Sequence, residues 1–347
     1  MVLFLKSILR TDKLLKMSVI HRAMQDSWQE LAEQLDLKVK KCVSYSQLKR
    51  VIRGIDIESF NAINAQYFGS TVSQQEPHWQ SVDGKELCGS IDGVLGQKRG
   101  QSVVSLTVHQ TGQSEIVGYY DGSKESEKPV VTAYFEEVGP LKGGYTFDAL
   151  HTFPRNMELI HQRAGLYLAQ VKANQKVLLE DCELIHRHLG ANHHSHQCQK
   201  GHGRVETRRA WGYELDAASL EERWEGSGIR SLLVIERLRY QIKTRKQSSE
   251  TAYWVSNQVL DSQSFDELIE AIRGHWAVEV HHHIRDVQMG EDRMITRNPR
   301  EARVMAGFIT TATNMLMSQG QNLAELRERL TRNQELVDPL FKRKNVL

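Results

Sequence analysis

The sequence has little cysteine and no long hydrophobic run. Only 4 of its 347 residues are cysteines, and they are irregularly spaced with no Cys-x-x-Cys pair. This scarcity argues against a disulfide framework and favours the reducing cytoplasm. No window approaches the roughly 18 apolar residues of a membrane span. The opening segment MVLFLKSILR has an apolar run too short for a signal peptide, and Lys6 and Arg10 interrupt it. We therefore expect neither secretion nor a membrane partner.

The sequence also lacks a strong net charge and a phosphate-binding loop. The net charge of +2 neither demands nor excludes a polyanionic partner. A G-x-x-x-x-G-K motif is missing, so the sequence does not indicate ATP use. The charge is unevenly spread, because residues 1–53 contain 11 lysines and arginines against 5 acidic residues. A basic front favours nucleic-acid binding, although a solvated basic helical surface explains the charge equally well.

The first predicted region, residues 1–75, is helical and basic. Its apolar residues recur at helical spacing, and Ser44 is typical of a helix cap. Lys49 and Arg50 follow that cap, so this helix is a candidate for contact with a DNA backbone. A packing helix with a basic outer side explains the same pattern. A polar linker at 71–77 ends the region.

The second predicted region, residues 76–175, alternates strands and helices. Short segments rich in β-branched and aromatic residues predict the strands, and turn residues separate them. The expected strands are 79–82, 103–109, 115–120, 144–147 and 166–171, with helices at 129–138 and 154–164. Three strands in a meander, followed by alternating helices and strands, indicate an α/β domain with a ribonuclease-H-like core.

The third predicted region, residues 176–263, is a β-rich insertion that opens with a His-rich loop. Its expected strands are 205–211, 231–238 and 252–256. The last region, 264–347, opens with one long amphipathic helix, Ser264 to Asp292, with Ser264 and Glu267 spaced as a capping box. Helical spacing continues into the tail, which ends in the basic residues 342–344.

Three carboxylates are the candidate catalytic residues. Asp83 follows the first predicted strand and Asp148 follows the fourth. Each alone is weak evidence, because Asp-Gly after a strand is usually a turn signal. In this topology the first and fourth strands are neighbours, so both aspartates reach one end of the sheet, where Glu279 of the long helix can join them. Three carboxylates together repel one another and need a cation, and their oxygens suit Mg²⁺, which supports phosphodiester displacement.

Other polar clusters allow two readings each. Lys172, Asn174 and Gln175 follow the fifth strand of the core and are candidates for DNA contact, or else form a polar loop. His275 shares a face of the long helix with Glu279 and is a further DNA-contact candidate. Eight cysteines and histidines fall within about two dozen residues, but their spacing matches no standard zinc site, which favours a loop without metal. They are Cys182, His186, His188, His193, His194, His196, Cys198 and His202.

Several short blocks of residues follow one another between about 44 and 320. They are Asp83-Gly84-Lys85-x-Leu87-x-Gly89-Ser90, Lys124-x-Ser126-Glu127, Asp148-Ala149-Leu150-His151-Thr152, Val171-Lys172-Ala173-Asn174-Gln175, His202-Gly203-Arg204-Val205-Glu206, Arg273-x-His275-Trp276-x-Val278-Glu279, Asp286-Val287 and Glu291-Asp292. In this order they resemble a known family, the H-repeat-associated (ISAs-type) insertion-sequence transposases within the DDE transposases. Phe153 and Val280 stand where that family has glutamine and asparagine.

The resemblance implies a DNA transposase with Asp83, Asp148 and Glu279 as its catalytic triad and metal ligands. It implies Mg²⁺ (or Mn²⁺) as cofactor and double-stranded DNA, at element ends and target, as partner. It further implies a homodimer in the DNA complex and a nucleoid-associated place in a bacterial cytoplasm. Two alternatives stay open: a metal-dependent nuclease of the same fold, and a catalytically degenerate remnant that binds DNA.

Overall fold

The computed structural model describes most of the chain, and its residues form two compact units. The first unit comprises residues 1–74, 84–127 and 277–347, and the second comprises 75–83 and 128–276. The predicted linker and the basic residues 342–344 lie outside the described residues. The described residues are 4–5, 8–9, 16–34, 38–39, 41–69, 78–122, 124–139, 141, 143–201, 203–216, 220–320 and 322–337.

The first unit is mainly helical, and its front is helical as predicted. Helix α4 begins at the predicted cap: the Ser44 Oγ accepts the N–H of Gln47, and the Gln47 side chain accepts the N–H of Ser44. This reciprocal pair satisfies the first free N–H groups of the helix. The elements of the unit include α2 (Met17–Asp26), α3 (Trp28–Gln34), α4 (Tyr45–Gly54), α5 (Ile57–Gly69), β2 (Gln101–Val108), β3 (Ser114–Asp121), α10 (Trp276–His283), α11 (Pro299–Met317) and α12 (Leu323–Arg332).

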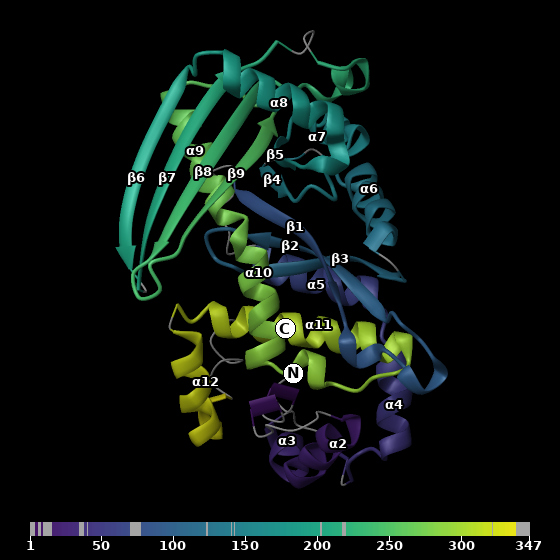
Figure 1. The fold of residues 1–347 in the computed structure, drawn as a ribbon. Helices are drawn as coiled ribbons and strands as arrows, with labels where there is room; N and C mark the ends of the chain where they lie inside the picture. Colours follow the sequence, from purple (N-terminus) through teal and green to yellow (C-terminus); the bar gives the residue numbers. More distant parts are fainter. Residues whose placement is uncertain are drawn as a thin grey trace. The chain divides into compact units, whose positions relative to one another are not determined.

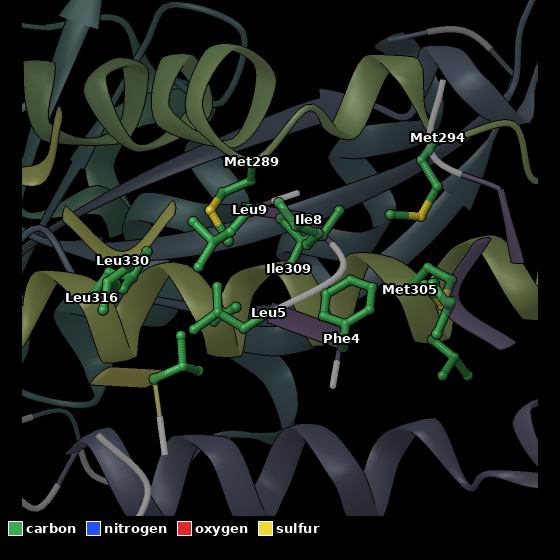
Figure 2. Close-up of a cluster of buried hydrophobic side chains, with 14 of the residues drawn as sticks. Phe4, Leu5, Ile8, Leu9, Met289, Met294, Met305, Ile309, Leu316 and Leu330 are labelled. Carbon is green, nitrogen blue, oxygen red and sulfur yellow. The ribbon is translucent and has the colours of Figure 1, made fainter. Parts of the chain in front are cut away.

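Helix α11 is the centre of the first unit's core (Figure 2). Most of its residues are buried, including the polar side chains of Thr310, Thr313 and Asn314. Ile309 and Leu316 are fully buried and pack in one cluster with Leu5 near the N-terminus and Leu330 of α12. The ends of the sequence that the structure describes therefore fold against one helix. No helix in the described part of the chain is long and apolar enough to cross a membrane.

Strand β1 (Trp79–Glu86) belongs to both units, since residues up to Asp83 lie in the second and the rest in the first. In the first unit the strand order is β3-β2-β1, and in the second it is β1-β4-β5-β9-β8-β7-β6. Strand β4 (Gly144–Phe147) pairs in parallel with β1 and with β5 (Leu166–Val171), whereas β9 (Gln247–Ser256) pairs antiparallel with β5. A mixed sheet with helices confirms the predicted α/β class.

The second unit contains three of the predicted core strands, which are β1 as far as Asp83, β4 and β5, and two elements that the sequence analysis missed. The predicted His-rich loop is wrong: residues 176–188 form helix α8 (Lys176–His188), and residues 193–201 form strand β6 (His193–Gly201). His202 lies outside the described residues. The remaining elements are α6 (Glu127–Glu137), α7 (Pro154–Gln162), β7 (Arg204–Glu214), β8 (Ser231–Gln241) and α9 (Ser262–Gly274).

The antiparallel strands β6 to β9, here called the hairpin arm, pack against α9 (Figure 1). Ala210, Leu233 and Trp254 of the arm bury apolar surface with Phe265 and Leu268 of α9. Trp254 is thus a core residue. The predicted strands 205–211, 231–238 and 252–256 lie within β7, β8 and β9.

The single long helix predicted from Ser264 to Asp292 is wrong in two respects. Its start is capped by Asp261, whose side chain accepts the N–H of Ser264 while Ser264 Oγ accepts the N–H of Asp261. The helix is also interrupted at His275, which separates α9 from α10. Apolar spacing continues through this point, so the sequence pattern could not reveal the break.

Candidate active site

Asp83 and Asp148 are brought together by the register of two parallel strands. Val82 of β1 lies opposite Phe147 of β4, and each aspartate is the next residue. Neighbouring strands are about 4.8 Å apart, and residues at equal register share a face. Both aspartates are partly buried. The sequence analysis placed Asp83 at the end of its strand, and this is wrong, because β1 continues to Glu86. Only the pairing of β1 with β4 ends at Val82.

The Asp148 carboxylate is oriented by the loop that follows it. Its Oδ1 accepts the N–H of Leu150 at 2.9 Å and the N–H of His151 at 3.4 Å. This is the local turn that aspartate side chains commonly form with backbone two or three residues further on. Thr152 secures the loop, because its hydroxyl donates to the carbonyl oxygens of Asp148 and Gln170 at 3.1 and 2.7 Å. The carboxylate is therefore held in one direction before any ligand arrives.

His275 docks on the face of the sheet that carries the two aspartates. Ser81 and Thr146 lie two residues before Asp83 and Asp148, so they share that face. The Ser81 hydroxyl donates to the His275 carbonyl at 3.1 Å, and the Thr146 hydroxyl is hydrogen-bonded to His275 Nδ1 at 2.9 Å. The break between α9 and α10 thus coincides with a residue that the sheet holds at both backbone and side chain.

Burial lowers the pKa of His275 to about 4, and the positive charges of Lys172 and His151 act in the same direction. The Asp148 carboxylate opposes this shift, because a negative charge favours the imidazolium. The net effect keeps the ring neutral near pH 7. A neutral imidazole beside Asp148 can exchange a hydrogen bond but does not neutralise the carboxylates.

Glu279 lies in the first unit, on the first turn of α10, and its side chain is exposed. Its convergence with Asp83 and Asp148 stays a prediction. Across the residues that the structure describes, no group of three or more histidines, cysteines, aspartates and glutamates has the arrangement of a metal site.

The chain around Glu279 is anchored by charge pairs within the first unit. Lys85 Nζ lies 2.6 Å from the Asp286 carboxylate and 3.8 Å from that of Asp292. Arg285 and Glu291, both nearly inaccessible to solvent, form a two-pronged pair at 2.9 and 2.6 Å. Burial raises the pKa of Asp286, while the Lys85 ammonium opposes the rise. The sequence analysis named Lys85, Asp286, Glu291 and Asp292 only as members of the family blocks, and it did not name Arg285. Ion-pair partners depend on the fold and cannot be predicted from the sequence pattern.

Gly84 directly follows Asp83, and close packing explains why a glycine stands there. A Cβ at this position would come within 2.2 Å of the Glu127 side chain. Glu127 is fully buried and accepts a hydrogen bond from the Tyr120 hydroxyl at 2.8 Å. The Asp-Gly pair is therefore a strand-interior feature, and the turn reading of these two residues is wrong.

The remaining predicted DNA contacts are distributed over both units. Lys49 of α4 faces Glu301 at 3.5 Å, so its charge is partly offset, whereas Arg50 is exposed. Lys172 is exposed after β5, and Asn174 and Gln175 hydrogen-bond to the loop after β4. Their contact with DNA stays a prediction.

The hairpin arm carries an arginine-rich face that sequence reasoning missed. Strand alternation places Arg204, Arg208, Arg237 and Arg239 on the same face as Ala210, beyond the part that packs on α9. Glu206 contacts three of these arginines, at 3.5 Å (Arg204), 2.5 Å (Arg208) and 3.3 Å (Arg239). Although burial raises the pKa of Glu206, the three guanidinium charges hold it below its usual value. Arg204 and Arg208 are four residues apart, and this even spacing places both on one face of a strand. The spacing was the sequence signal that could have predicted the arginine-rich face.

Neither a protein-family profile nor a curated protein matches this chain.

Proposed function

We propose that this protein is a DDE-type DNA transposase that cleaves and joins phosphodiester bonds at the ends of an insertion sequence. The observation that carries the proposal is the parallel register that sets Asp83 beside Asp148. Adjacent carboxylates repel each other and are stabilised by a cation. The neighbouring positions of strands one and four, together with the meander before them, are what a ribonuclease-H-like core requires.

The oxygen donors that the chain offers are of the type that suits a divalent metal. Asp83 and Asp148 offer hard oxygen donors, and Glu279 is the third ligand that the resemblance implies. Mg²⁺ or Mn²⁺ bound there would activate the attacking oxygen and stabilise the leaving one. The chain's own part is to orient the donors: backbone N–H groups fix Asp148, and Ser81 and Thr146 fix a neutral His275 beside it.

DNA is the proposed partner, bound as a duplex by a protein dimer. The basic front of the chain and the arginine face of the hairpin arm support this proposal, because guanidinium and ammonium groups bind phosphate without reading sequence. The Glu206 carboxylate faces three arginines, so positive charge is in excess on that face.

The decisive experiment is a cleavage and strand-transfer assay on plasmid DNA that carries the flanking sequence of the gene. We expect Mg²⁺-dependent nicking and joining, and loss of both in Asp83→Asn, Asp148→Asn and Glu279→Gln. Asp121→Asn, at the exposed end of β3, is the matched control and should retain activity. Nicking without joined products would favour the nuclease alternative. DNA binding without nicking in the unaltered protein would favour the degenerate remnant.

A further inference from the structure

A pocket opens in the second unit against the loop that follows Asp148. Its volume is about 500 Å³, a size typical of small-molecule sites. Helix α6 forms one wall, and the loops after β4 and β5 form the others, at the carboxyl ends of parallel strands where α/β proteins commonly bind ligands. The lining residues are Lys128, Pro129, Thr132, Ala133, Glu136, Leu150, Phe153, Asn174 and Gln175.

Two amide side chains tie the loops together and make the pocket a preformed feature. Asn174 Nδ2 donates to the Ala149 carbonyl, and Gln175 Nε2 donates to the Thr152 carbonyl, each at 2.6 Å. Because the nitrogens are committed to carbonyl oxygens, each amide leaves its own oxygen as an acceptor. Leu150, another wall residue, donates its N–H to Asp148. The loop after β4 therefore both lines the pocket and orients the Asp148 carboxylate.

The rest of the lining suits a flat aromatic ligand next to an anion. Phe153, which replaces the glutamine of the transposase family, supplies an aromatic surface, and Leu150 and Pro129 add apolar surface. Glu136 is paired with Arg155 at 3.0 Å, so its negative charge is offset. Lys128 supplies a positive charge at the wall.

We propose that this pocket holds a nucleobase that has left the DNA stack, and that it prefers bases with an exocyclic amino group. Aromatic side chains stack on any base. The amide oxygens of Asn174 and Gln175 accept hydrogen bonds from the amino groups of adenine, cytosine or guanine, which thymine lacks, and Lys128 faces the phosphate. The inference rests on the proposed function, because the loop that lines the pocket is also the loop that orients Asp148.

The test uses full-length protein in buffer with EDTA, so that binding is measured without cleavage. The probes are fluorescent duplexes that share one sequence and carry one unpaired position, occupied by adenine, cytosine, guanine, thymine or an abasic sugar. We expect amino-bearing bases to bind about five- to a hundred-fold tighter than the abasic site, the range that single-base stacking provides. Thymine should fall between them.

Three variants decide the outcome. Phe153→Ala should remove the preference for a base while leaving abasic affinity unchanged, and Phe153→Trp should retain the preference. Asn174→Ala should bring adenine and thymine closer together. Thermal unfolding establishes that each variant is folded. Equal affinity for all five probes, or an undiminished preference in folded Phe153→Ala, overturns the pocket assignment and leaves the transposase proposal standing. Absence of binding to every duplex overturns both.

Discussion

At the residue scale, the surroundings of the two aspartates are shaped by uncharged polar residues on the same face of the sheet. Ser81 and Thr146 precede Asp83 and Asp148 by two residues and hold His275 on the same face. Such partners commonly decide whether ligand side chains keep the geometry that catalysis requires.

Thr146→Val should destabilise the protein by about 1–3 kcal/mol, because it leaves the Nδ1 atom of the buried His275 ring without its hydrogen bond. Urea-induced unfolding measures the change. Thr251→Val, at an exposed position on β9, is the matched control and should fall within about 0.5 kcal/mol of the unaltered protein. Equal losses in the two variants would contradict the prediction.

His281 should make stability depend on pH. Burial, aided by the positive charge of Arg285, lowers its pKa to about 3 from 6.5. The unfolded chain therefore binds the proton first, and stability falls as the pH drops below 6.5 towards 3. Between these two pH values the free energy of unfolding falls by about 1.4 kcal/mol for each pH unit. Glu115 and Asp286, whose pKa values are raised mainly by burial, act in the opposite direction.

Comparison with His281→Leu removes the contribution of those carboxyl groups, because both proteins contain them. We expect the free energy of unfolding to fall less between pH 7 and pH 5 in the variant than in the unaltered protein. Denaturant titrations at the two pH values measure this difference. Parallel pH dependence in both proteins would show that His281 does not titrate as its burial requires.

At the element scale, the sequence predicted strands better than helix continuity. Strands β4 and β5 have the predicted bounds, since turn residues flank compact apolar runs. The break at His275 was invisible because it depends on contacts with Ser81 and Thr146, more than a hundred residues away in sequence. Strand β6 was missed because its polar composition has no alternating pattern.

The hairpin arm offers an element-scale prediction. Replacing Arg208 and Arg239 together by glutamate should weaken duplex DNA binding and reduce its salt dependence, because each lost phosphate contact lowers the log–log slope by about 0.9. Fluorescence anisotropy over a range of salt concentrations measures both quantities. Arg208→Glu alone, compared with Arg230→Glu, an exposed substitution just before β8, controls for the change in charge. An unchanged slope in the double variant would remove the arm from the DNA interface.

At the scale of the whole molecule, the sequence predicted the α/β class and the neighbouring positions of the strands that carry Asp83 and Asp148, but it could not predict how the chain divides into two units. The second unit contains Asp83 and Asp148, while the first contains Glu279. The sequence analysis grouped the helix predicted from Ser264 to Asp292 with the tail, in the single region 264–347. The structure instead divides this helix near Trp276. Helix α9 packs on the hairpin arm in the second unit, whereas the residues of α10 from Ala277 onward belong to the first unit.

Divalent metal should stabilise the folded protein if the carboxylates hold it. We expect Mg²⁺ or Mn²⁺ to raise Tm, and the rise to grow with the logarithm of the metal concentration above the dissociation constant, because a ligand that binds only the folded state adds to its stability. Differential scanning fluorimetry with and without metal measures the shift. Asp148→Asn should abolish it and Asp121→Asn should not. An equal shift in both would assign the metal effect to another part of the protein.

Strand β6 has a practical consequence for anyone who handles this protein. It is the last strand in the order of the described sheet, and most of its nine residues are exposed. A strand in this position offers a row of backbone groups to any other extended chain, which makes it a template for aggregation. Loss of material should therefore grow with protein concentration and storage time. The substitution Gln197→Lys should slow the loss of protein to aggregation, because repulsion between like charges opposes edge-to-edge pairing of two copies.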